Sequence, residues 1–146
     1  MKATLTSGTG LSGTGIGSIS SFTFSTCIGA LGIQYTLKTS HLPFAMNAAS
    51  YNSKTGTAKG SITGIHGTFA GPACSFVLDG TGPGKDNGTL ALTYVNGTQR
   101  LNFLKTGGNL HVYKLNGCGA FVTNNKDPLT LSGTGTATPA QTITSP

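Results

Sequence analysis

The chain has 146 residues, and this length is enough for one domain with its own core. Its formal net charge is +6, although only 8% of its residues are charged. Its basic residues are scattered and include one arginine, whereas nucleic-acid-binding proteins concentrate charge on one face. No run reaches the roughly 20 apolar residues of a membrane-spanning helix. We therefore expect neither a nucleic-acid partner nor a membrane span.

Short apolar runs alternate with Thr, Ser and Asn, and glycine occurs 23 times. A period of two is typical of strands with one buried face, and no segment shows the three-four spacing of an amphipathic helix. We expect a single all-β domain over residues 1–146, an antiparallel β-sandwich or partly closed barrel of about ten short strands with essentially no helix. Residues 1–15 are expected to form a flexible or truncated N-terminal strand.

The first half of the chain contains five predicted strands, at 18–27, 33–38, 42–51, 57–66 and 74–78. Pro43 lies near the start of the third and cannot donate to a strand ladder, so this segment is expected to be an edge strand or a crossover. A turn at Gly71-Pro72 separates the last two.

The second half begins with a predicted three-stranded antiparallel meander, at 90–94, 101–103 and 110–114. Asn96-Gly97 is typical of a two-residue hairpin in which both central residues take positive φ, and Gly107-Gly108 offers the second tight turn. Further short strands are expected at 120–123, 129–138 and 141–144. Gly-Thr pairs near both ends, such as Gly13-Thr14 and Gly133-Thr134, suggest that the two ends lie side by side.

Three cysteines leave one unpaired if a single bridge forms. The expected disulfide joins Cys74 to Cys118, and Cys27 is then a free or unpaired thiol. The alternative is three reduced, buried thiols, since free cysteine behaves as a small hydrophobe. The Ser/Thr/Gly-rich composition favours a secreted, extracellular protein. No signal peptide follows Met1-Lys2, so we expect a mature form or a shortened N terminus.

The side chains that could support catalysis are few: Asp79, Asp86, Asp127, His41, His66 and His111. Asp79 and Asp86 share one Gly-rich segment that is typical of a turn, because calcium sites gather more acidic oxygens. The chain has no nucleophile elbow and no zinc-type cysteine spacing. We expect no enzymatic activity, no metal and no cofactor.

Sugar binding has a physical basis in this sequence. Aromatic rings pack on pyranose rings, and tyrosine tolerates a half-exposed position. The candidate ligand-binding residues are Tyr35, Tyr94, His111 and Tyr113. The absence of tryptophan weakens this interpretation, and the alternative is that these tyrosines only fill the sheets.

Several segments resemble a group of small exported β proteins of Streptomyces and related actinobacteria. They are Gly-Ser-Ile-Thr-Gly-Ile-His-Gly from Gly60, Gly71-Pro-Ala-Cys74, Thr-Gly-Gly-Asn-Leu-His-Val-Tyr from Thr106, and the ending from Thr138. The similarity runs from about residue 16 onward. It implies export and a disulfide-bearing β fold, but no catalytic residue, because the group has no assigned activity. It also implies a further cysteine upstream of the position of Cys27, which this chain lacks.

The combined expectation is a secreted, non-enzymatic binding or surface-associated module whose partner is a polysaccharide or another cell-envelope component. One alternative is a carrier of a small apolar molecule, and the actinomycete enediyne-binding apoproteins are similar in architecture, although usually acidic. An apolar cleft of several hundred Å3 would favour the carrier. The other alternative is a structural subunit that self-associates through its sheet edges into an oligomer or filament.

Overall fold

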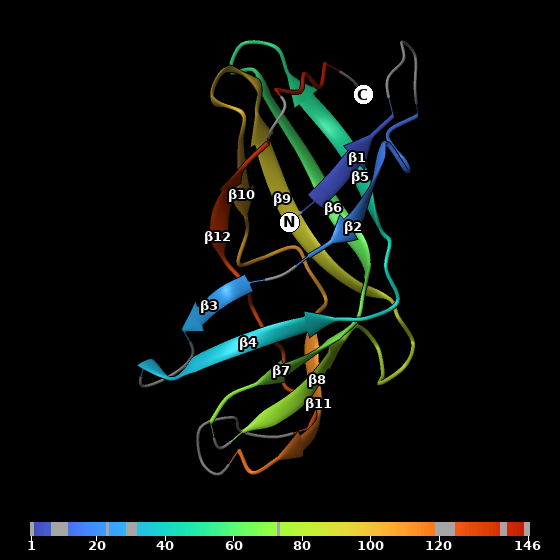
Figure 1. Cartoon of the computed structure of the whole chain (residues 1–146). Helices are drawn as coiled ribbons and strands as arrows, with labels where there is room; N and C mark the ends of the chain where they lie inside the picture. The colour runs from blue at the N-terminus through green and yellow to red at the C-terminus, as the bar shows by residue number, and fades with distance from the viewer. Residues whose placement is uncertain are drawn as a thin grey trace.

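A computed structural model describes residues 2–6, 12–22, 24–28, 32–72, 74–118, 125–137 and 140–144. These residues form two antiparallel sheets, with the strand orders β1-β2-β5-β6-β9-β10-β12 and β11-β8-β7-β4-β3 (Figure 1). The predicted all-β fold is confirmed. Among the described residues, no helix has the length and hydropathy needed to cross a bilayer.

The seven-stranded sheet consists of β1 (Lys2–Leu5), β2 (Gly17–Ser21), β5 (Phe44–Asn52), β6 (Thr57–Ile65), β9 (Gly88–Val95), β10 (Arg100–Phe103) and β12 (Gly133–Thr136). The five-stranded sheet consists of β3 (Phe24–Ile28), β4 (Gln34–Thr39), β7 (Gly67–Ala70), β8 (Ser75–Asp79) and β11 (His111–Asn116). The chain changes sheet several times. The predicted strand at 18–27 is therefore two strands, β2 and β3, in different sheets, and His66 alone separates β6 from β7.

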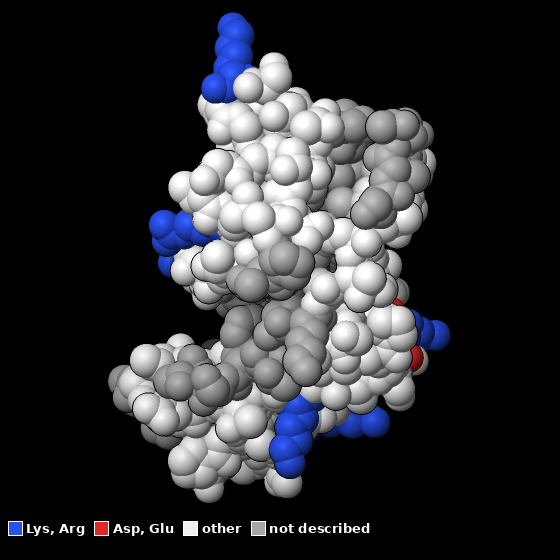
Figure 2. Space-filling view, turned by 45° about the horizontal axis from the view of Figure 1, so that its top comes forward, with Lys and Arg blue, Asp and Glu red and all other residues white. Residues whose placement is uncertain are grey.

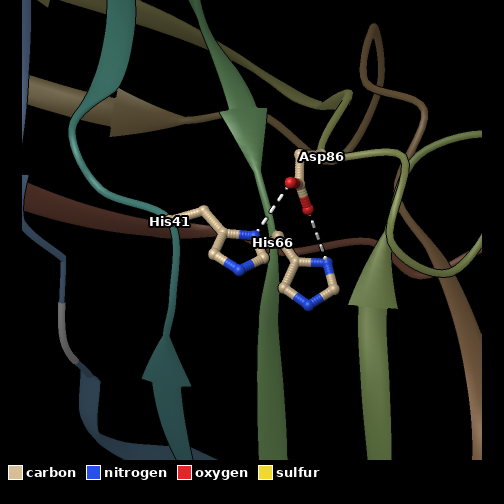
Figure 3. A group of neighbouring side chains, drawn as sticks. All are labelled: His41, His66 and Asp86. Carbon is tan, nitrogen blue, oxygen red and sulfur yellow. Dashed lines mark ion pairs between the residues drawn. The ribbon is translucent and has the colours of Figure 1, made fainter.

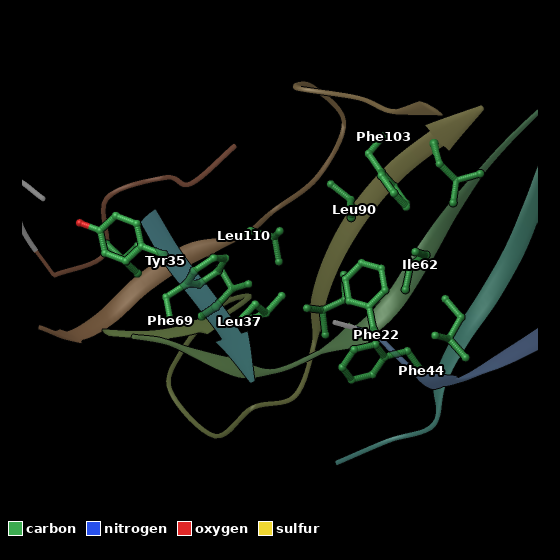
Figure 4. Packing of buried hydrophobic residues seen from close by; sticks show 14 of the residues in the cluster. Phe22, Tyr35, Leu37, Phe44, Ile62, Phe69, Leu90, Phe103 and Leu110 are labelled. Carbon is green, nitrogen blue, oxygen red and sulfur yellow. The ribbon is translucent and has the colours of Figure 1, made fainter. Parts of the chain in front are cut away.

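One hydrophobic core joins the two sheets (Figure 4). Phe22 lies between β2 and β3 and packs edge-on against Phe44 and Phe103, with ring centroids 6.0 Å away in both cases. Buried and half-buried residues alternate along the whole of β9. The period of two read from the sequence is therefore the real burial pattern of this strand.

The expected central meander is only partly correct. β9 and β10 do pair, but β11 pairs with β8 in the other sheet and β12 occupies the edge beside β10. The predicted two-residue hairpin between β9 and β10 is wrong, because the connection is a 3-10 turn over Asn96–Thr98. Gln99, with a φ of 56°, takes the left-handed conformation that was expected at Asn96 and Gly97.

The segment after Pro43 is a central strand and not the expected edge strand. β5 pairs with both β2 and β6. Pro43 precedes the first residue of β5, so its missing N–H interrupts no ladder. The segment at 141–144 is not a strand, β12 occupies part of the expected strand at 129–138, and the segment at 120–123 lies outside the described residues.

The predicted disulfide is confirmed. Cys74 precedes β8 and Cys118 follows β11, so the bridge joins two paired strands across a sequence separation of 44 residues. Cys27 in β3 is a half-buried free thiol. Burial raises the pKa of the Cys27 thiol and so disfavours the reactive thiolate.

Candidate functional site

The seven-stranded sheet is curled (Figure 1). It carries a cavity of about 410 Å3 on its inner face. Residues of β1, β5, β6, β9, β10 and β12 line it. The sheet therefore wraps around the cavity as part of a barrel, which agrees with the partly closed barrel that was one form of the predicted fold.

The cavity exists because small residues replace large ones along one face of the sheet. Met46, Ile62 and Leu90 are aligned across β5, β6 and β9 and belong to the core. Two residues further along the same strands, the aligned positions are Ala48, Gly60 and Leu92. Ala48 contributes only a methyl group here. Gly60 allows β5 and β6 to approach closely, since a Cβ at Gly60 would overlap the Asn47 carbonyl oxygen. The described residues that line the cavity include none from the five-stranded sheet.

Residues from both ends of the chain line this cavity. Leu5 in β1 and Ile16 before β2 contribute from the N-terminal side. Ala137 and Ile143 contribute from the C-terminal side. Residues near both ends of the chain therefore line one cavity, although β1 and β12 are the opposite edges of the sheet.

The segment 140–144, which we name the C-terminal strap, is held by side chains and not by a strand ladder. Asn96 Nδ2 donates to the Ile143 carbonyl at 2.8 Å, and the Ile143 N–H donates to Asn96 Oδ1 at 3.0 Å. Gln99 Oε1 accepts the Gln141 N–H at 2.5 Å, and the Tyr94 hydroxyl donates to the Gln141 carbonyl at 2.8 Å. The β9–β10 connection therefore fixes the strap over the cavity.

The polar groups of the lining are few. Tyr94 is 2% exposed. Burial raises the pKa of Tyr94, and the hydrogen bond to the Gln141 carbonyl opposes this only in part, so the phenol is a neutral donor at physiological pH. Asn47 and Lys59 also border the cavity. Their side chains alternate with inward-facing neighbours, since Lys59 is exposed and the Asn47 amide bonds to Gly15 and Thr63, so the lining is mainly aliphatic. Such a site combines apolar surface with a few groups that orient a ligand.

The four residues selected from the sequence do not share one surface. Tyr94 lines the cavity, whereas Tyr35 on β4 packs against Phe69 and Phe76 in the other sheet. The Tyr113 hydroxyl donates to the Gly80 carbonyl at 2.8 Å, and His111 Nδ1 lies 3.1 Å from the same oxygen. Tyr35, Tyr94 and Tyr113 are 7%, 2% and 6% exposed, so none presents an open ring face.

A polar network surrounds Asp79 at the end of β8, where the carboxylate is fully buried. His66 Nδ1 lies 2.8 Å from Asp79 Oδ2. Five backbone N–H groups also donate to this carboxylate: Gly80, Gly84, Lys85, Asp86 and Asn87. Burial alone would raise the pKa of Asp79, but the hydrogen bonds from His66, Gly80, Asp86 and Asn87 outweigh it and lower the pKa.

His66 also belongs to a second cluster, together with His41 and Asp86 (Figure 3). The rings of His41 and His66 are stacked, with centroids 5.1 Å apart and an interplanar angle of 19°. Asp86 Oδ2 lies 2.8 Å from His41 Nδ1, and Asp86 Oδ1 lies 3.2 Å from His66 Nδ1. These three residues could hold a metal ion, and sequence spacing gave no sign of it because they come from three separate connections.

Basic side chains are scattered across the face shown in Figure 2, and they form no continuous stripe there. Proteins that follow a phosphate backbone concentrate such charge. Comparison with known protein families, with curated proteins and with solved structures finds no match for this chain. The geometry of the sites is therefore the basis for assigning a function.

Proposed function

We propose that this protein is an exported, non-enzymatic carrier that binds a small apolar molecule on the inner face of the seven-stranded sheet. The observation that carries the proposal is the cavity of about 410 Å3 with its mainly aliphatic lining. Small-molecule sites typically measure about 300–1,000 Å3 and bury most of their ligand. The disulfide supports export, because such bonds persist in oxidising compartments.

The lining selects the chemical class of the ligand. Leu5, Leu92, Leu101 and Ile143 offer aliphatic contacts on several sides of the cavity. Each Å2 of apolar surface removed from water contributes about 25 cal/mol, which favours a compact hydrophobic ligand.

Polysaccharide recognition, which the sequence favoured, has weaker geometric support. A sugar-binding surface needs exposed aromatic faces, and Tyr35, Tyr94 and Tyr113 are buried. An apolar cleft of several hundred Å3 is the feature expected of a carrier, and the cavity of about 410 Å3 has a volume in that range. The geometry therefore supports the carrier better than a glycan-binding module.

Titration with the apolar fluorophore N-phenyl-1-naphthylamine tests the carrier directly. We expect saturable binding with a 1:1 ratio to the wild-type protein, and at least a tenfold loss of affinity in Ala48→Phe. Ala48 is buried and lines the cavity, so the added ring fills part of the space that the ligand needs.

The matched control is Ala45→Phe, an exposed position on the same strand that does not line the cavity. This variant should bind like the wild type. Equal binding by all three proteins, or no binding by the wild type, would remove the carrier proposal. A glycan array probed in parallel would then show whether the protein is a polysaccharide-binding module instead, and light scattering would reveal self-association.

Release of the C-terminal strap should accelerate ligand exchange. Asn96→Ala removes two hydrogen bonds to Ile143, and each bond of this kind contributes about 1 kcal/mol. We expect the dissociation rate of the fluorophore, measured by stopped flow, to rise roughly thirtyfold, since the two bonds total about 2 kcal/mol and 1.4 kcal/mol is one order of magnitude. Asn52→Ala is the control, because the Asn52 side chain accepts hydrogen bonds from Lys54 and Thr55 in its own turn and does not line the cavity. An unchanged dissociation rate in Asn96→Ala would show that the strap does not gate the cavity.

A further inference from the structure

The cluster of His41, His66 and Asp86 shares no residue with the cavity lining. His41 precedes β5, His66 lies between β6 and β7, and Asp86 lies between β8 and β9. Both imidazole rings turn Nδ1 toward the Asp86 carboxylate, with one ring on each of its oxygens (Figure 3). One potential ligand atom from each residue lies within 4.8 Å of the others.

The hydrogen bonds leave one carboxylate oxygen of this cluster without a donor. A proton on His66 Nδ1 can be donated to only one of the two facing carboxylates, and Asp79 Oδ2, at 2.8 Å, is the nearer acceptor. Asp86 Oδ1 is the more distant oxygen, at 3.2 Å, and it is a buried atom with no hydrogen-bond partner. Buried polar atoms normally have partners, and an orphan of this kind is often explained by a water or an ion.

The charge at this position also favours a cation. Asp79 and Asp86 place two carboxylates beside the same imidazole ring. Within the described ranges, their only ion-pair partners are the two histidines, and neither carboxylate has a lysine or arginine partner. A metal ion could supply the missing positive charge while the imidazole rings remain neutral.

From these observations we propose that His41 Nδ1, His66 Nδ1 and the Asp86 carboxylate bind a divalent transition-metal ion of the Zn2+ class. Imidazole and carboxylate ligands suit zinc, whereas calcium and magnesium prefer oxygen ligands alone. Tetrahedral bonds of about 2.0–2.1 Å separate neighbouring ligand atoms by about 3.3 Å. The observed N–O distances of 2.8 and 3.2 Å are close to this separation.

The surroundings permit the small rearrangement that metal binding requires. The ion would replace the protons between the imidazoles and the carboxylates, so binding releases protons. Asp79 would lose its hydrogen bond from His66 but would keep its backbone N–H donors, so this buried carboxylate would remain satisfied. The His41 side chain is 60% exposed and can move toward the ion, which leaves a fourth position open to water.

Calorimetric titration of the chelator-treated protein with ZnCl2 tests the site. We expect one equivalent of Zn2+ to bind the wild type, and His41→Ala and Asp86→Asn each to lower the affinity at least tenfold. His111→Gln is the control, since it removes the histidine outside the cluster and should leave the affinity unchanged. Excess Mg2+ or Ca2+ should not compete.

A second measurement covers the case in which a substitution perturbs the fold. Co2+ bound to the wild type should give the visible absorption of a low-coordinate site with nitrogen and oxygen ligands, and this absorption should vanish on addition of Zn2+. Absence of binding by the wild type would overturn the proposal, as would wild-type affinity in both cluster variants or loss of binding in His111→Gln. In those cases the cluster is only a set of histidine–aspartate ion pairs.

Discussion

Asp79→Asn is expected to lower the free energy of unfolding by about 3–5 kcal/mol, the usual result of removing one partner from a buried charged network. Asp79 is fully buried, and its two carboxylate oxygens accept hydrogen bonds from His66 and from backbone N–H groups of the β8–β9 connection. An asparagine keeps one acceptor oxygen and places an NH2 group against other donors. Urea denaturation followed by circular dichroism measures the difference.

Asp86→Asn provides the matched control for this experiment. It makes the same change of charge seven residues away, but the Asp86 side chain is 38% exposed. Asparagine also tolerates the left-handed backbone that Asp86 adopts, with a φ of 52°. In the metal-free protein we expect a loss of less than about 1 kcal/mol, because the carboxylate is partly exposed and partly exposed ion pairs contribute little. Equal losses in the two variants would show that the buried Asp79 network stabilises the fold no more than the partly exposed Asp86 carboxylate does.

The same carboxylate predicts acid sensitivity with a defined sign. The pKa of Asp79 is lower in the folded protein than in the unfolded chain, where it is about 3.9. Its contribution to stability is therefore complete above the unfolded-state value and is lost as the pH falls toward the folded-state value. The stability difference between wild type and Asp79→Asn should shrink between pH 5 and pH 2 (roughly the range over which such groups titrate). A difference that grows on acidification would contradict the lowered pKa.

Removal of the disulfide is the second change expected to have a large effect. Cys74 and Cys118 are 44 residues apart in sequence, and closing a loop of this length restricts the unfolded chain. Chain-entropy arguments give an upper value of about 4 kcal/mol, and typical measured values are about 2–4 kcal/mol. The double variant Cys74→Ala/Cys118→Ala should lower the free energy of unfolding by this amount in urea titrations.

Cys27→Ala distinguishes loss of the cross-link from loss of a cysteine side chain. Cys27 is free and half-buried, so its replacement should cost less than about 1 kcal/mol. A reducing agent should destabilise the wild type and Cys27→Ala equally, and should leave the double variant unchanged. Insensitivity of the wild type to reduction would contradict a stabilising role for the bridge.

The alternating pattern predicted which faces of the strands are buried, but it did not predict which strands pair. β9 and β10 were correctly expected as neighbours, because a short connection joins them. β11 has an equally clear pattern, yet it crosses to the other sheet and pairs with β8. Period-two burial specifies the inner face of a strand and carries no information about its sheet when two sheets share one core.

Local sequence patterns predicted neither candidate site, for different reasons. The cavity depends on Ala48 and Ala58, and small residues are too common in this chain to stand out. The metal-ligating cluster joins His41, His66 and Asp86, which only the chain crossings between sheets bring together. The segment from Asp79 to Asp86 was correctly expected to connect two strands. The contacts of its two aspartates with histidines were not predicted.

Isotope-edited NMR of methyl groups in the presence of N-phenyl-1-naphthylamine locates the bound molecule directly. If the inner face of the seven-stranded sheet holds the ligand, nuclear Overhauser effects should connect the fluorophore to the methyl groups of Ala58, Leu92 and Ile143, which line the cavity. Contacts confined to outward-facing methyl groups such as Ala45, or no contacts at saturating fluorophore, would contradict a carrier function for this fold.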